Sequence, residues 1–177
     1  MKGFLFGIAT MILILALGLL FALMGFVNMR ADNPPSKMET TLAGHAMDAS
    51  VARAAPKVTN PVTADEANLV AGAHLYSAHC TLCHGDPAHP KSAVADSLNP
   101  PAPQFTNDMA DLPENHNFYI VRHGIRWTAM PGWKNVLSEQ QTWQLVTLLS
   151  HMHDLPPAAK QVFAEAGPRT GPSSASH

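Results

Sequence analysis

The sequence predicts an all-α protein in which one apolar helix at the N-terminus precedes a small helical domain. Two observations support this fold class. The first 30 of the 177 residues contain an uninterrupted apolar run, and three later segments place apolar side chains at helical spacings of three and four residues. No segment alternates polar and apolar residues for more than a few positions, as a half-buried strand would.

Residues 3–27 are long enough to cross a membrane as one helix. They carry no charge, and 25 helical residues span roughly 37 Å, more than a hydrocarbon core of about 30 Å. A cleaved signal peptide is the alternative, but its apolar region has about 7–15 residues and ends at a small-residue cleavage site, which this run lacks. The sequence therefore predicts an uncleaved single-pass anchor over residues 1–30. Lys2 precedes the helix, whereas Arg30 and Asp32 nearly cancel, so we expect the N-terminus in the cytoplasm and the remainder on the periplasmic side of the inner membrane.

The remaining chain divides into a linker, a domain and a tail. Residues 31–63 contain four Pro, balanced charges and no sustained periodicity, which predicts a flexible linker with a short turn near residues 40–47 and a root-mean-square span of roughly 30 Å. Residues 156–177 are rich in Ala, Pro, Ser and Gly, and we expect a largely disordered tail with a short helix near residues 158–166. Residues 64–155 are then the folded domain.

Three helices are expected within this domain. The first follows a capping-box pattern at residues 63–66, the second covers residues 113–123 between a Pro and a Gly, and the third begins at a capping box at residues 138–141. Between the first two helices lies a long Pro-rich loop over residues 86–111. A loop of that length in a small domain usually wraps around something, and a thin core is completed most readily by a cofactor.

The segment Cys80-Thr81-Leu82-Cys83-His84 carries the most specific chemical signal. Two Cys three residues apart place both sulfurs on one side of a helical turn, where each forms a thioether with a haem vinyl group while the adjacent His binds the iron. A redox-active dithiol is an alternative, but it is expected within a βαβ pattern. A structural zinc site is another, and it would need a second Cys/His pair at set spacing, which the domain lacks despite its eight His.

Charge excludes one class of partner and suggests another. The chain has 11 Lys and Arg against 13 Asp and Glu, so no basic excess indicates nucleic-acid binding. Residues 64–155 contain four Lys and Arg and nine Asp and Glu, a net charge of −5. Such a domain is steered toward a partner with a basic or neutral docking face, although the same acidity also serves plain solubility.

Over residues 64–155 the sequence resembles the class I cytochrome c family, specifically its small membrane-anchored bacterial members. The resemblance rests on residues 80–85, on the Pro-rich run at residues 99–103, on residues 124–133 and on the closing helix with Trp143. It implies one covalently bound haem c. It also implies that the methionine preceding a proline, here Met130, is the sixth iron ligand. Ala129 stands where the family usually has Gly.

An iron with His and Met in both axial positions is closed to substrates and has a raised reduction potential. We therefore expect an electron carrier and not an enzyme. It would pass single electrons between respiratory-chain partners, such as a membrane respiratory complex or a terminal oxidase, as a tethered shuttle or as a complex subunit. The alternative is a peroxidase-like enzyme or gas sensor with an open or displaceable sixth site, for which His123 or His116 would be the distal group. Met109 and His123 are alternative ligands to Met130.

Further site residues are predicted around the haem. Arg126 and Trp127 are candidates for contacts with the haem propionates, against the alternative of an exposed Arg and a pocket-wall Trp. The other ring nitrogen of His84 is expected to donate a hydrogen bond to a backbone carbonyl at residues 99–101. The resemblance also implies a close crossing of the first and last helices, in which Gly72 and Tyr76 lie on the first. Trp143 would supply the aromatic residue of the last helix, because Leu148 stands where an aromatic is common.

Overall fold

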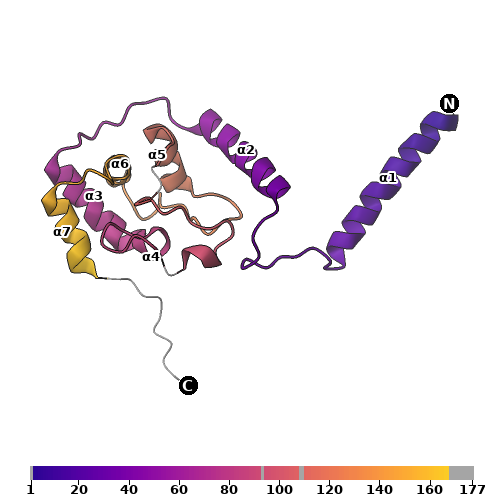
Figure 1. Ribbon diagram of the computed structural model, residues 1–177. Helices are drawn as coiled ribbons and strands as arrows, with labels where there is room; N and C mark the ends of the chain where they lie inside the picture. Colours follow the sequence, from indigo (N-terminus) through magenta and orange to yellow (C-terminus); the bar gives the residue numbers. More distant parts are fainter. Residues whose placement is uncertain (1, 93, 108–109, 168–177) are drawn as a thin grey trace, which may run out of the picture. The chain divides into compact units, whose positions relative to one another are not determined.

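The computed structural model describes residues 2–92, 94–107 and 110–167, and the described part of the chain is all-helical, as predicted (Figure 1). Within those residues it contains seven α-helices, one short 3₁₀-helix and no β-strand. Residues 1–30 and 31–177 form two separate compact units. The helices are α1 (Lys2–Leu23), α2 (Lys37–Ala54), α3 (Glu66–His79), α4 (Thr81–His84), η1 (Ala95–Ser97), α5 (Glu114–His123), α6 (Glu139–Ser150) and α7 (Pro157–Ala166).

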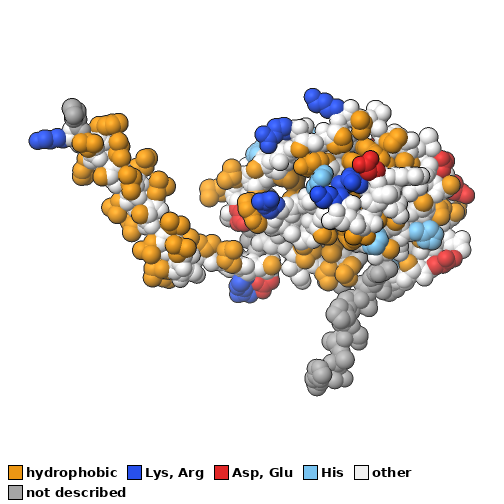
Figure 2. Space-filling view, turned by 180° about the vertical axis from the view of Figure 1, so that it is seen from behind, with side chains coloured by type: hydrophobic (Ala, Val, Ile, Leu, Met, Phe, Trp, Pro, Cys, Tyr) orange, Lys and Arg blue, Asp and Glu red, His pale blue; other side chains and the backbone are white. Residues whose placement is uncertain are grey.

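Helix α1 is apolar all round by its sequence, and the face seen in Figure 2 is covered mostly by apolar side chains. An 18-residue window of this 22-residue helix has a mean hydropathy of 2.7, and none of its residues is buried within the protein. A helix that is apolar all round and covered by no other part of its unit needs an apolar solvent. Length and composition therefore fit a membrane span, and a signal sequence would meet the same two criteria.

The expected flexible linker is largely a helix, so that prediction was wrong. Ser36 caps α2, because its hydroxyl accepts a hydrogen bond from the Glu39 amide at 3.2 Å while the Glu39 carboxylate accepts one from the Ser36 amide at 3.4 Å. Val51 and Ala55 are buried at the end of this helix, which packs against α5. The segment after α2 is also attached to the domain through two hydrogen bonds, one from Asn115 Nδ2 to the Pro56 carbonyl at 3.0 Å and one from Asn60 Nδ2 to the hydroxyl of Thr147 at 2.8 Å.

Helices α3 and α6 cross at the close approach that the resemblance implied. A Cβ atom added to Gly72 would lie 2.6 Å from the carbonyl oxygen of Gln144 and 3.0 Å from Cβ of Leu148. Only Gly permits backbones to approach this closely. The N-cap of α3 is Asp65, whose carboxylate accepts a hydrogen bond from the Asn68 amide at 2.9 Å. The N-cap is therefore the third residue of the predicted pattern over residues 63–66, and not its first residue, Thr63.

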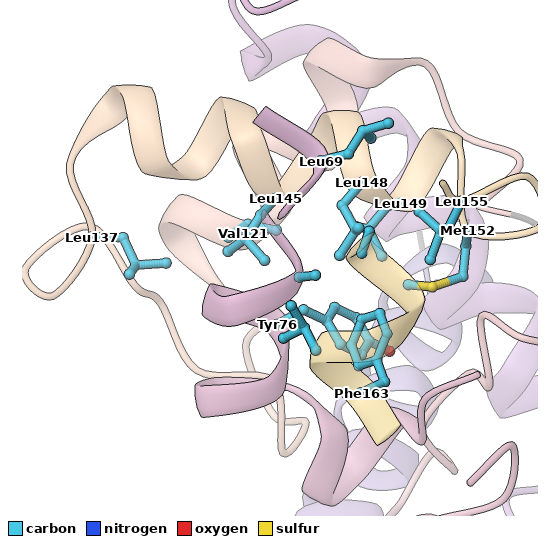
Figure 3. Close-up of a cluster of buried hydrophobic side chains, with 13 residues drawn as sticks. Leu69, Tyr76, Val121, Leu137, Leu145, Leu148, Leu149, Met152, Leu155 and Phe163 are labelled. Atoms are coloured by element: carbon cyan, nitrogen blue, oxygen red, sulfur yellow. The ribbon is translucent and has the colours of Figure 1, made fainter. Parts of the chain in front are cut away.

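Helix α7 belongs to the core, so placing residues 156–166 in a largely disordered tail was wrong. The expected helix is present, and its Ala159, Val162 and Phe163 are buried in the main hydrophobic cluster (Figure 3). The ring of Phe163 meets that of Tyr76 edge to face, with centroids 5.9 Å apart. The expected disorder of the last ten positions lies outside the described residues.

Trp143 was expected to supply the aromatic partner of Tyr76, and it does not. Its ring stacks on Phe118 of α5 with centroids 4.0 Å apart, in a second cluster completed by Val146 and Val62. Phe163 of α7 takes the expected role instead. The third helix begins as predicted, with Ser138 and Gln141 forming a capping box.

Candidate functional site

The turn between α3 and α4 places Cys80, Cys83 and His84 in one short helical segment. Cys80 ends α3 and precedes α4, and its carbonyl accepts hydrogen bonds from the amides of Cys83 at 3.1 Å and His84 at 2.9 Å. Gly85 then ends the segment at φ +66°, a conformation that L side chains rarely adopt. The short spacing of the motif thus fixes these three side chains locally.

The His84 imidazole is oriented by the Pro-rich loop. Its Nδ1 lies 2.8 Å from the carbonyl oxygen of Pro103, and its ring stacks on Phe105 with centroids 4.9 Å apart. Because a carbonyl only accepts, Nδ1 carries the proton and Nε2 carries the lone pair. Burial lowers the pKa of His84, and the bond to Pro103 partly opposes that shift, so the imidazole is neutral at pH 7. The sequence had placed this carbonyl at residues 99–101, so the acceptor lies two positions further along.

Gln104 ties the same loop to the Cys-containing segment, a function that the sequence analysis missed. Its Nε2 donates to the carbonyl oxygens of Cys83 at 3.0 Å and Ala102 at 2.9 Å, while its Oε1 accepts from the Ser92 amide at 2.7 Å. One amide side chain therefore joins three backbone segments directly beside Pro103. No sequence pattern marks Gln104, because its partners lie up to 21 positions away.

Met130 lies in a hairpin-like loop over residues 121–134. The two limbs of the loop are paired by hydrogen bonds from the amides of Trp133 to the Val121 carbonyl at 3.0 Å and of Ile125 to the Met130 carbonyl at 3.1 Å. Gly124 has φ +69°, and a Cβ atom there would lie 2.6 Å from the Met130 carbonyl oxygen. The close contact of the two limbs thus requires Gly at this position.

Cys80, Cys83, His84 and Met130 line one cavity. Its walls enclose about 610 Å³ of space, counting the part that is open to solvent. Apolar and Pro residues make up most of the walls, which is the surrounding that a macrocycle with an apolar face requires. The remaining lining residues are His79, Leu98, Pro100, Pro101, Ala102, Pro103, Ile125, Thr128, Ala129, Pro131 and Trp133.

The other site residues predicted from the sequence do not line this cavity or lie outside the described residues. Arg126 and Trp127 are exposed and do not line this cavity, although the Arg126 guanidinium lies 6.0 Å from the Trp127 ring centroid. His123 is exposed, and neither it nor His116 lines the cavity. Met109 lies outside the described residues. The sequence had not identified His79 and Trp133, whose rings contact each other with centroids 4.9 Å apart at the cavity wall.

The Cys80 thiol lacks the lowered pKa of the attacking thiol in a reactive dithiol. Burial, with a smaller contribution from Cys83, raises the pKa of the Cys80 thiol to about 12, so little thiolate is present at neutral pH. Among the described residues, no group of three or more His, Cys, Asp or Glu is arranged to hold a metal ion. The two Cys thiols, the His nitrogen and the Met sulfur that line the cavity fit a covalently attached haem.

The comparison with known families agrees with this donor set. Residues 67–149 match the family model described as cytochrome C oxidase, cbb3-type, subunit III, a cytochrome c family. Residues 67–149 are therefore a class I cytochrome c-like domain. No curated protein matches the chain. The matched range includes the Cys-containing segment, the Pro-rich loop and the Met130 loop. A cytochrome c domain implies covalently bound haem c with its iron and a function in electron transport.

Proposed function

We propose that this cytochrome is a membrane-anchored monohaem electron carrier that passes single electrons between respiratory redox partners on the periplasmic side. The observation that carries the proposal is the convergence of Cys80, Cys83, His84 and Met130 on one apolar cavity. His84 and Met130 come from distant segments of the chain, so their convergence does not follow from the motif alone.

In this proposal each of the four residues has a defined function. Cys80 and Cys83 would form the thioethers and hold the haem at the end of α3. His84 would offer Nε2 to the iron, because the Pro103 carbonyl holds the proton on Nδ1. Met130 would offer its thioether sulfur from the loop that Gly124 holds close. With these two ligands the haem would supply one-electron chemistry, and no substrate bond would be broken.

The membrane and partner assignments rest on three further observations. Helix α1 has the length and hydropathy of a membrane span, and its flanking charges favour a cytoplasmic N-terminus. The matching family model is described as a subunit of a cbb3-type oxidase, which favours a membrane respiratory complex or terminal oxidase as the partner. Protease accessibility of residues 31–177 in intact spheroplasts, compared with lysed ones, tests the orientation. Protection in intact spheroplasts would contradict it.

The ligand set is tested by absorption spectra of the full-length, haem-loaded protein and of the Met130→Ala variant. We expect the oxidised wild type to show the weak far-red band of a methionine–iron bond, and the reduced wild type to leave carbon monoxide unbound. Met130→Ala is expected to lose the band and to bind carbon monoxide. Met38→Ala is the matched control, because Met38 is 79% exposed on α2.

Either of two results would contradict the proposal. Ready binding of carbon monoxide by the wild type would indicate an open or weakly held sixth site and would favour the enzyme or sensor hypothesis. A wild-type spectrum that Met130→Ala leaves unchanged would exclude Met130 as the ligand.

A further inference from the structure

The Met130 loop concentrates positive charge in an otherwise acidic domain. Three of the four Lys and Arg between residues 64 and 155 lie within residues 121–134, and the sequence between Glu114 and Glu139 contains no acidic residue. The domain therefore has a net negative charge but a positive loop. A partner that approaches this loop meets a local field opposite in sign to that of the domain as a whole.

The loop has an inner side and an outer side. Ile125, Met130 and Trp133 line the cavity, whereas Arg126 and Lys134 are exposed. The Lys134 amide donates to the Arg122 carbonyl at 3.1 Å, which places the bases of the two limbs beside each other. The positive groups thus lie on the outer side of the same loop that forms one wall of the site.

Most of this charge is available for a partner. Arg122 is half-buried and lies 3.8 Å from the Glu139 carboxylate. Among the described residues, Arg126 and Lys134 have no carboxylate within salt-bridge distance, whereas Lys91 lies 3.2 Å from Asp96. Arg126 and Lys134 are therefore the two cations of the loop whose attraction to an external acidic group is least offset.

Trp127 at the tip of the loop is 92% exposed. Its φ is +61°, and among the described residues Trp127 is the one residue other than Gly with a left-handed backbone. The turn that holds it is closed by a bond from the Thr128 amide to the Ile125 carbonyl at 3.2 Å and by one from the Met130 amide to the Thr128 hydroxyl at 3.1 Å. A bulky residue in this conformation is strained. Large aromatic side chains are enriched among the residues that anchor protein interfaces.

We propose that the outer side of residues 121–134 is the docking surface for an acidic redox protein, with Trp127 as its aromatic anchor and Arg126 and Lys134 as its electrostatic guides. The proposal rests on the proposed function, since the loop matters for electron transfer only if it encloses the haem. Ala129 and Pro131 are exposed and also line the cavity, so a partner seated here approaches the site across a single layer of side chains. Net charge alone predicted a partner with a basic or neutral docking face. At this surface the proposal replaces it with a partner that has an acidic docking face.

The transfer is a one-electron step. The reduced cytochrome loses one electron, and a cupric blue-copper centre on the probe protein becomes cuprous. No bond forms or breaks, and no proton moves. A small acidic blue-copper protein is therefore a suitable probe, and a basic one is the comparison.

The test measures the second-order rate of this step by stopped flow for the full-length, haem-loaded cytochrome in detergent. We expect Arg126→Gln combined with Lys134→Gln to slow the reaction with the acidic probe about tenfold at low salt. The rate for the basic probe should not fall. The matched control, Lys91→Gln with Lys160→Gln, removes the same charge elsewhere and should change the rate less than about twofold. Trp127→Ala should slow the reaction with the acidic probe at low and high salt alike, because apolar contacts are not screened.

A binding measurement complements the rates. On adding the cuprous acidic probe to the ¹⁵N-labelled cytochrome, the indole resonance of Trp127 should shift while that of Trp143, which is 5% exposed, stays in place. Equal slowing by both double variants, or an unshifted Trp127 resonance, would overturn the proposal.

Two other results would assign the surface to a different occupant. A Trp127 shift in anionic-lipid nanodiscs without the probe would reassign the surface to the membrane. Concentration-dependent dimers abolished by the loop variant would reassign it to self-association. The carbon monoxide test on each variant separates these results from a failure of the proposed ligand set.

Discussion

Replacing Phe163 by Ala tests whether α7 is an integral part of the cytochrome domain. The Phe163 ring is fully buried, at 0% exposure. It meets Tyr76 of α3 edge to face at a centroid distance of 5.9 Å. A residue in a disordered tail would have neither property. The two descriptions of residues 156–166 therefore predict very different effects of the same substitution.

The magnitude follows from burial. Truncating a fully buried Phe to Ala removes its transfer free energy and leaves a cavity, which together cost about 3–5 kcal/mol. The edge-to-face pair with Tyr76 is part of this loss and contributes about 0.5–1.5 kcal/mol. A small domain has a free energy of unfolding of about 5–15 kcal/mol, so the substitution removes a large share of its stability. In a disordered tail the cost would stay within about 0.5 kcal/mol.

The assay is urea unfolding of the full-length, haem-loaded protein in detergent, followed by haem absorbance and circular dichroism. With a slope of about 2 kcal/mol per molar urea, a loss of about 4 kcal/mol lowers the midpoint by about 2 M. Lys160→Ala is the matched control, since Lys160 is exposed on the same helix. A loss below about 1 kcal/mol for Phe163→Ala would refute the reasoning, because it falls below the cost of truncating a buried Phe.

Three further predictions follow from single contacts. Gly72→Ala should destabilise the domain by about 1–3 kcal/mol in the same assay, because the new Cβ meets the Gln144 carbonyl at 2.6 Å, and an unchanged midpoint would argue against the close helix crossing. Gln104→Leu should cost about 1–3 kcal/mol for each polar group it leaves buried without a partner. It should also move the reduction potential, since the loop that orients His84 is released, whereas a stability loss at constant potential would limit Gln104 to a structural role. Ser36→Ala should lower the stability of α2 by about 0.5–2 kcal/mol, seen as faster amide exchange at residues 37–54 with little change at α6, and uniform exchange in both helices would contradict it.

The proposed docking loop changes how net charge is interpreted in this protein. An overall charge of −5 over residues 64–155 describes the long-range field, which salt screens within about 10 Å at 0.1 M. At contact distance the partner meets Arg126 and Lys134 and not the domain average. The sign of the local field, which net charge did not predict, then determines which redox proteins dock at this surface.

Features that depend on neighbouring residues could be predicted from the sequence. The spacing of Cys80, Cys83 and His84 places them together because helical geometry relates positions three and four apart. The apolar run of α1 and the capping box at Ser138 are local for the same reason. These patterns were enough to predict an all-α chain with a c-type haem motif, and the family match agrees.

The tertiary structure decided everything that joins distant segments. It brought Met130 into the cavity that His84 lines, and it made the Pro103 carbonyl the acceptor for His84. It also recruited α7 to the core through Phe163 and turned Trp127 outward. For Met130, His84 and Phe163 the deciding partner lies far along the chain. Composition alone made residues 31–63 and 156–166 look like linker and tail, because their few apolar side chains gain stability only from surfaces that the rest of the fold supplies.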